Sequence, residues 1–354
     1  MVSIDALRGF DMFWIIGAEE IFHALRKISN AGPAAFLAHQ FHHVSWEGFV
    51  FYDLIFPLFV FIIGISVVFS LDRILENEGK AAAYRRIFRR AALLFLLGVF
   101  YDEGVANWHE ENVICGVLQR LALAYFFTGL LYCNFKRKGL VVAFFALILG
   151  YWALLSFVPV PSTGKTSFEE GVNWTHYVDQ HMPPYYDTDP EGYLSTATAV
   201  ASCLLGVFAA LLLKDNETGD RRKVLALIAG GAVMAVLGYA WGLQMPVIKH
   251  LWTSSYVLVA GGYSCMLLGV FYQVIDVWQY RKWATPFIWI GSNSLAIYMI
   301  TNMAGMDKLA ERFVGGDIEA ALGPYGDLLV TIVAVGMCLL IVRYMYRKQI
   351  FIRV

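Results

Sequence analysis

Two histidines, His42 and His43, stand directly before a Val-Ser-Trp-Glu-Gly stretch. An imidazole can accept one proton near neutral pH, and a positioned base typically accelerates a reaction about 10²–10⁴-fold. Asp53, further along the chain, could accept a hydrogen bond from such a ring and hold its tautomer. It could equally be a helix-start residue, because Pro57 cannot donate to its carbonyl and a bend is expected there. The spacing alone does not separate His42 from His43.

Three more polar residues lie in apolar runs, where insertion into a membrane is costly: Glu19, Arg120 and Asn293. On an ideal helix Glu19 is about 20° from Arg8, so the two share a stripe that could face a polar cavity. Arg120 must pair with a carboxylate, a phosphate or backbone carbonyls, and a structural role competes with ligand binding. Asn293 could join helices. We expect Arg8 to pair with Asp11.

The composition is that of a membrane protein. Of 354 residues, 58% are hydrophobic and 16% are charged, whereas soluble proteins average about 45–50% apolar and about 25% charged residues. This excludes an ordinary soluble enzyme and a disordered chain. A net charge of −1 offers no basic surface for nucleic acid. The five cysteines form no Cys-x-x-Cys pair, so we expect no metal site.

Ten segments are candidates for membrane helices, each of which needs about 20 largely apolar residues. They cover about 9–25, 51–71, 87–101, 113–133, 139–158, 192–213, 223–242, 252–273, 285–303 and 327–346. No linker divides the chain. The sequence therefore predicts an all-α polytopic membrane helical bundle of about 10 transmembrane helices, forming one integral domain over residues 1–354.

Basic residues follow every even-numbered segment, and such residues are enriched in cytoplasmic loops. The richest cluster follows the second segment: Arg85, Arg86, Arg89 and Arg90. The alternation supports the short segment 87–101 as a span and predicts that both termini are cytoplasmic. It places two long connections outside, residues 26–50, with His43 and Trp46, and residues 159–190.

The outer connection 159–190 is rich in proline and aromatic residues among carboxylates, including Asp189. Aromatic faces beside carboxylates suit a sugar, because its apolar face stacks on rings while its hydroxyls bind acids. A belt of tryptophan and tyrosine at the membrane interface is the competing interpretation.

Seven segments in consistent order resemble the heparan-α-glucosaminide N-acetyltransferase family, within the wider group of transmembrane acyltransferases. They extend over nearly the whole chain: Ser3–Gly9, His43–Gly48, Asp53–Gly64, Gly116–Arg120, Asp189–Gly192, Leu251–Tyr256 and Gly291–Leu295. Each motif alone is weak, but seven in register are specific.

The resemblance implies a membrane enzyme that takes acetyl from cytoplasmic acetyl-CoA. It passes the acetyl to the amine of glucosamine, or of a glucosamine-terminated glycan, on the opposite side. The family's catalytic histidine belongs to a His-x-Ser-Trp motif and falls on His43, not His42. Glu19 stands where the family's first span has an asparagine that contributes to the site. Asp53 would orient His43, and Glu19 would orient the acceptor or assist proton transfer.

The resemblance also suggests where the two substrates bind. For the acceptor we expect contacts from Trp46, Glu19, Asp189 and Glu191. For acetyl-CoA we expect Arg120 and Asn293 along the pantetheine arm. The phosphates of CoA would meet the basic cluster: Arg85, Arg86, Arg89 and Arg90. The positive-inside rule also explains these arginines without CoA. The sequence leaves open whether the acetyl group rests on His43 or passes directly.

We expect a bacterial-type, multi-pass inner-membrane enzyme, because the chain lacks the extra luminal N-terminal region of the lysosomal enzyme. A homodimer is one option for the assembly. The main competing function is an amino-sugar transporter of the inner membrane, with Glu19 and Arg120 on its path. Transporters often contain repeated halves, and the sequence shows no such repeat. A non-catalytic scaffold would leave the buried charges unexplained.

Overall fold

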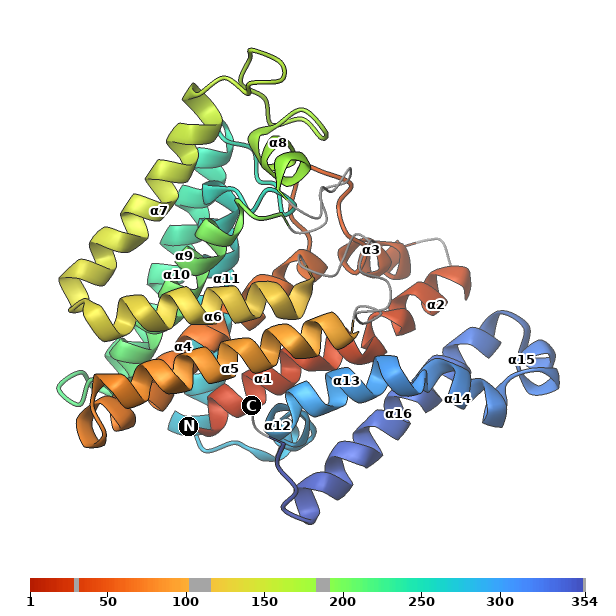
Figure 1. Cartoon of the computed structure of the whole chain (residues 1–354). Helices are drawn as coiled ribbons and strands as arrows, with labels where there is room; N and C mark the ends of the chain where they lie inside the picture. The colour runs from red at the N-terminus through yellow and green to blue at the C-terminus, as the bar shows by residue number, and fades with distance from the viewer. Residues whose placement is uncertain (29–31, 102–115, 183–191, 353–354) are drawn as a thin grey trace. The chain divides into compact units, whose positions relative to one another are not determined.

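Figure 1 shows the computed structural model of the chain, which describes residues 1–28, 32–101, 116–182 and 192–352. Within these ranges the regular structure is helical, and an isolated bridge between Glu47 and Ile248 is the one β-type pairing. The all-α class predicted from the sequence is therefore confirmed.

The described residues form two units. The first contains residues 1–44 and 50–55, together with the chain from Leu267 to the end of the described residues. The second contains residues 45–49 and 56–266. The single domain expected for residues 1–354 stays a prediction.

The first unit starts with α1 (Val2–Phe13), a π-helical turn (Trp14–Ala18) and α2 (Glu20–Ile28). The helix breaks at Gly17, whose φ of 111° is strained for residues other than glycine. The expected span 9–25 is thus an interrupted helix. The stripe that placed Glu19 above Arg8 assumed a continuous helix, so that part of the prediction is wrong.

Two short elements follow in the same unit, α3 (Gly32–Gln40) and a 3-10 turn (Phe51–Leu54). Its later helices are α12 (Thr285–Ser292), α13 (Ser294–Ala304), α14 (Met306–Val314), α15 (Asp317–Leu322) and α16 (Gly326–Arg347). α1 packs directly on α12. A Cβ at Gly9 would lie 1.7 Å from the carbonyl oxygen of Phe287, so glycine permits this close backbone contact.

The remaining helices run between residues 55 and 277. They are α4 (Ile55–Asn77), α5 (Lys80–Tyr101), α6 (Val117–Asn134), α7 (Arg137–Phe157), α8 (Trp174–His181), α9 (Thr196–Lys214), α10 (Asp220–Gly242) and α11 (Ser254–Phe271), which a π-helical turn (Tyr272–Val277) extends. In the second unit, α6 packs on both α5 and α9. Gly64 of α4 and Gly206 of α9 allow another close helix contact, since a Cβ at Gly64 would lie 1.8 Å from the Cys203 carbonyl oxygen.

Six helical segments are long and apolar enough to cross a membrane, by length and composition: Phe51–Asn77, Arg137–Phe157, Thr196–Lys214, Asp220–Gly242, Ser254–Val277 and Asp317–Arg347. Each overlaps one of the ten expected spans. The other four expected spans are helical where described, but α5 and α6 carry arginines, and 9–25 and 285–303 are interrupted at Gly17 and Asn293. The helices support an integral membrane protein, whereas ten spans and cytoplasmic termini stay predictions.

Candidate active site

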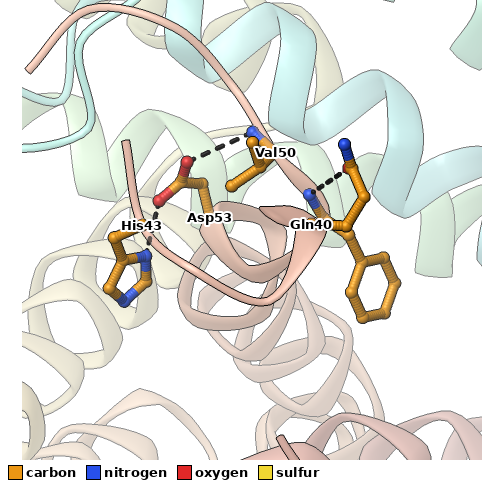
Figure 2. Close-up of polar contacts among 5 residues, drawn as sticks. Gln40, His43, Val50 and Asp53 are labelled. Atoms are coloured by element: carbon orange, nitrogen blue, oxygen red, sulfur yellow. Dashed lines mark hydrogen bonds and ion pairs between the residues drawn. The ribbon is translucent and has the colours of Figure 1, made fainter. Parts of the chain in front are cut away.

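A buried carboxylate and an accessible imidazole form the centre of the candidate site, in the first unit (Figure 2). Nδ1 of His43 lies 2.7 Å from Oδ1 of Asp53. The Asp53 side chain is 1% exposed, whereas that of His43 is 45% exposed. The other carboxylate oxygen of Asp53 accepts a hydrogen bond from the Val50 N–H at 3.2 Å. The two roles considered for Asp53 therefore occur together, because one oxygen meets the histidine and the other fixes the start of a helical turn.

This contact selects one tautomer of the imidazole. A carboxylate beside Nδ1 favours the form in which Nδ1 carries the proton and Nε2 carries a lone pair. Nε2 of His43 can then accept a proton from a substrate while Asp53 stabilises the resulting imidazolium. A base held by a third group is the recurring arrangement of general-base and nucleophilic sites.

The 3-10 turn places Asp53 beside His43. Two side chains fix the start of this turn by accepting backbone N–H groups. Oε1 of Gln40 accepts the Phe51 N–H at 3.2 Å, and Asp53 itself holds Val50 (Figure 2). The chain changes from a 3-10 turn to α4 after Leu54. The bend expected upstream of Pro57, which has no N–H to donate, stays a prediction.

Tyr52 brings Glu19 into the same cluster. Its hydroxyl donates to Oε1 of Glu19 at 2.9 Å, and its ring centroid lies 4.6 Å from that of the His43 ring, with 33° between the planes. The Oε2 atom of Glu19 is buried and has no hydrogen-bond partner in the described part of the chain. Since buried polar atoms are nearly always hydrogen-bonded, we expect the partner of this oxygen to be a water molecule or a ligand group.

Tyr52 was not singled out by the sequence. A tyrosine between Phe51 and Asp53 at the start of an apolar run is typical of a core or interface residue. Its position next to Asp53 is the signal that could have found it, because two adjacent residues of a tight turn can reach one ring.

His42 lies in a different environment from its neighbour. Its ring stands edge-on to that of His23, with centroids 5.7 Å apart. The contact with Asp53 is made by His43. The geometry thus separates two residues that spacing alone could not.

The expected pair between Arg8 and Asp11 is wrong. Arg8 lies 3.6 Å from Asp5 instead, and both side chains are partly exposed. Asp11 is fully buried, and within the described ranges neither of its carboxylate oxygens has a hydrogen-bond partner. Asp5 and Asp11 are equally spaced from Arg8, and burial of one face of α1 decides between them.

Asn293 interrupts the expected span 285–303 and forms hydrogen bonds with the backbone of residues 350 and 352. Its Nδ2 donates to the Ile350 carbonyl at 3.0 Å, and its Oδ1 accepts the Ile352 N–H at 3.1 Å. The residue is 1% exposed. These bonds give Asn293 a structural role, and its place beside the pantetheine arm stays a prediction.

In the second unit, Arg120 is buried among protein groups. It donates to the Gly192 carbonyl at 3.1 Å and to Oγ of Ser195 at 2.5 Å, and its guanidinium lies 5.0 Å from the centre of the Trp252 ring. A backbone carbonyl is one of the partners expected for this residue. These contacts give Nη2 and the face of the guanidinium protein partners, and contact with CoA stays a prediction.

Trp46, expected at the acceptor site, also lies in the second unit. Its Nε1 donates to the Phe168 carbonyl at 2.8 Å, and its ring stacks on that of His250, with centroids 5.6 Å apart. These two contacts join the segment around Trp46 to two parts of the chain that are far from it in the sequence. Asp189 and Glu191 lie outside the described residues.

The four arginines of α5 divide into two groups. Arg85, Arg86 and Arg89 are exposed, and Nε of Arg86 donates to Oγ of Ser70 at 3.3 Å. Arg90 is half-buried and its guanidinium lies 4.7 Å from the centre of the Tyr125 ring. The first three can meet an anion in solution, whereas Arg90 packs inside. In the described part of the chain, no cluster of three or more His, Cys, Asp or Glu side chains could hold a metal.

The segment that contains Glu19, His43, Tyr52 and Asp53 matches a known family. Residues 1–181, half of the chain, match the family model described as heparan-alpha-glucosaminide N-acetyltransferase, catalytic. The chain belongs to this family. The resemblance inferred from the seven motifs is confirmed, and Glu19, His43, Tyr52 and Asp53 all lie within the segment that matches the family's catalytic model.

Two curated members of the family are similar to most of the chain. The human heparan-alpha-glucosaminide N-acetyltransferase is 28% identical over 376 aligned residues, which cover 88% of this chain and 55% of the human protein. The mouse protein is 28% identical over 379 residues, covering 88% of this chain and 56% of its own length. The chain therefore spans just over half the length of these relatives.

Proposed function

We propose that this chain is an acetyl-CoA-dependent N-acetyltransferase whose acceptor is the amine of glucosamine or of a glucosamine-terminated glycan. Family membership supports acetyl transfer. The observation that carries the proposal is the 2.7 Å contact between His43 and Asp53, in the segment that matches the catalytic family model. It supplies a base whose lone pair is held at Nε2.

In the proposed step the acceptor, bound as its ammonium, first releases one proton to water, and the resulting neutral amine attacks the thioester carbonyl carbon of acetyl-CoA. The new C–N bond forms, the C–S bond breaks, and CoA leaves as its thiolate. The surplus proton on the nitrogen passes to Nε2 of His43. The imidazolium, stabilised by Asp53, returns this proton to the thiolate sulfur, so the free base is restored.

Glu19 is the proposed contact for the acceptor. Its Oε2 is buried and lacks a described protein partner, while Oε1 is held by Tyr52. A carboxylate so held can accept hydrogen bonds from an ammonium or from sugar hydroxyls. Trp46, Asp189 and Glu191 complete the acceptor contacts in the proposal.

The donor is proposed to bind from the cytoplasm at the exposed arginines of α5. Arg85, Arg86 and Arg89 present guanidinium groups that suit the phosphates of CoA. The same proposal includes ten spans with both termini cytoplasmic, which would place the donor inside and the acceptor outside. It also includes a bacterial inner membrane and a homodimer.

Purified protein in liposomes, given acetyl-labelled CoA and an acceptor panel, tests the proposal against transport. Glucosamine and an oligosaccharide with a terminal glucosamine should gain the label, whereas glucose, which lacks the amine, should not. Uptake of unmodified sugar into the liposomes without any acetylated product would contradict the enzyme and support the amino-sugar transporter.

A further inference from the structure

Two adjacent residues of one 3-10 turn hold the same imidazole from two directions. Asp53 meets Nδ1 of His43 at its edge, whereas the Tyr52 ring packs on the ring itself, with centroids 4.6 Å apart. The turn is fixed in place because Gln40 accepts the Phe51 N–H. The position of His43 therefore depends on Tyr52 as well as on Asp53.

The phenol end of Tyr52 is anchored in turn. It donates to Oε1 of Glu19 at 2.9 Å, which leaves Oε2 of the same carboxylate as the buried atom with no described partner. One side chain thus contacts both the base and the carboxylate proposed to bind the acceptor.

We propose that Tyr52 is a positioning residue that sets the distance between the base His43 and the acceptor-binding carboxylate Glu19. The ring restrains the imidazole, and the hydroxyl restrains the carboxylate. This inference rests on the proposed function for its kinetic consequence, but the contacts themselves can be tested without turnover.

The two ends of Tyr52 can be removed separately. Tyr52→Phe keeps the ring on His43 and removes the bond to Glu19. Tyr52→Leu removes both. Glu19→Gln keeps a carbonyl oxygen that can accept from the phenol, but it removes the negative charge. These three variants therefore distinguish packing, hydrogen bonding and charge.

Steady-state kinetics should separate the two ends. Tyr52→Phe should raise KM for the amine acceptor by up to about tenfold, because Glu19 loses the hydrogen bond that holds its carboxylate in place, and should lower kcat by less. Tyr52→Leu should lower kcat about tenfold further, because the imidazole loses its restraint. KM for acetyl-CoA should stay unchanged in Tyr52→Phe.

A matched control removes a phenol hydroxyl elsewhere. Tyr84 donates to Oδ1 of Asn134 at 2.8 Å in the second unit. Tyr84→Phe should leave both KM values unchanged. In the double variant Tyr52→Phe, Glu19→Gln, the two effects on the acceptor KM should combine to less than their product, since both changes disturb one pair.

A second measurement does not require turnover. Diethyl pyrocarbonate modifies accessible neutral imidazoles, and peptide mass spectrometry can compare His43 with His42 in the same peptide. Tyr52→Leu should raise the rate at His43 relative to His42 severalfold, whereas Tyr52→Phe should not. This comparison stands even if no acetyl transfer is found, so failure of the proposed function and failure of this inference are distinguishable.

Two results would overturn the inference. An unchanged His43-to-His42 modification ratio in Tyr52→Leu would show that the ring does not restrain His43. A Tyr52→Phe enzyme as inactive as one lacking His43 would show that the hydroxyl takes part in the chemical step itself.

Discussion

Asp53 serves His43 and the backbone of Val50 with its two carboxylate oxygens, at 2.7 Å and 3.2 Å. One buried group therefore sets both the tautomer of the base and the local path of the chain. The contact between His43 and Asp53 therefore depends on a helix start, and the consequences can be measured.

Asp53→Asn should lower kcat for acetyl transfer by about 10²-fold or more, the range attributed to a positioned base. The amide cannot accept from both Nδ1–H of His43 and the Val50 N–H, because one of its two atoms is a donor. KM for acetyl-CoA should change little. Initial rates with labelled acetyl-CoA check this, and a normal kcat would contradict the role of Asp53.

Glu19→Gln should raise KM for glucosamine about tenfold while preserving the contact with Tyr52, because the lost charge weakens binding of an ammonium. KM measured for a neutral hydroxylamine acceptor serves as the control and should change less. An equal change for both acceptors would contradict a charge-based contact.

Neutralising the exposed arginines of α5 should weaken donor binding. Arg85→Gln and Arg89→Gln should each raise KM for acetyl-CoA severalfold, and added salt should do the same in the unaltered protein, since exposed charges are screened. Steady-state rates at several ionic strengths provide the measurement.

Arg90→Gln is the matched control for those variants, because Arg90 packs over Tyr125. It should lower thermal stability and leave KM for acetyl-CoA unchanged. If Arg90→Gln alone raised this KM, the division of the four arginines would be contradicted.

Arg120→Met should destabilise the protein by about 1–3 kcal/mol, the usual effect of leaving a buried polar group without its partner. The bonds to Gly192 and Ser195 and the contact with Trp252 would all be lost. Thermal unfolding followed by tryptophan fluorescence in detergent measures the change. An unaltered melting temperature would show that these contacts contribute nothing to stability.

The helical class and the choice of Asp53 could be predicted from the sequence because both depend on local features. An apolar run long enough to cross a membrane predicts a helix without any knowledge of its tertiary contacts. Asp53 lies near the histidines and just before Pro57, so a turn that returns it to His43 is a short-range event.

The sequence-based predictions that were wrong or incomplete concern features that depend on tertiary packing or on a single backbone angle. Asp5 and Asp11 are equally spaced from Arg8, and only burial of one face of α1 selects Asp5. The positive φ of Gly17 ends the helical register assumed for Glu19. Asn293 bonds to Ile350 and Ile352, which are 57 and 59 residues away, so no local pattern shows them.

We propose that His43, and not His42, is the base. Initial rates of acetyl transfer should be compared for His43→Gln and His42→Gln, with thermal unfolding to confirm that both variants fold. We predict that His43→Gln loses at least about 10²-fold in kcat, while His42→Gln keeps the rate of the unaltered protein. A His43→Gln enzyme with a normal rate, or an equal loss in both variants, would contradict this account.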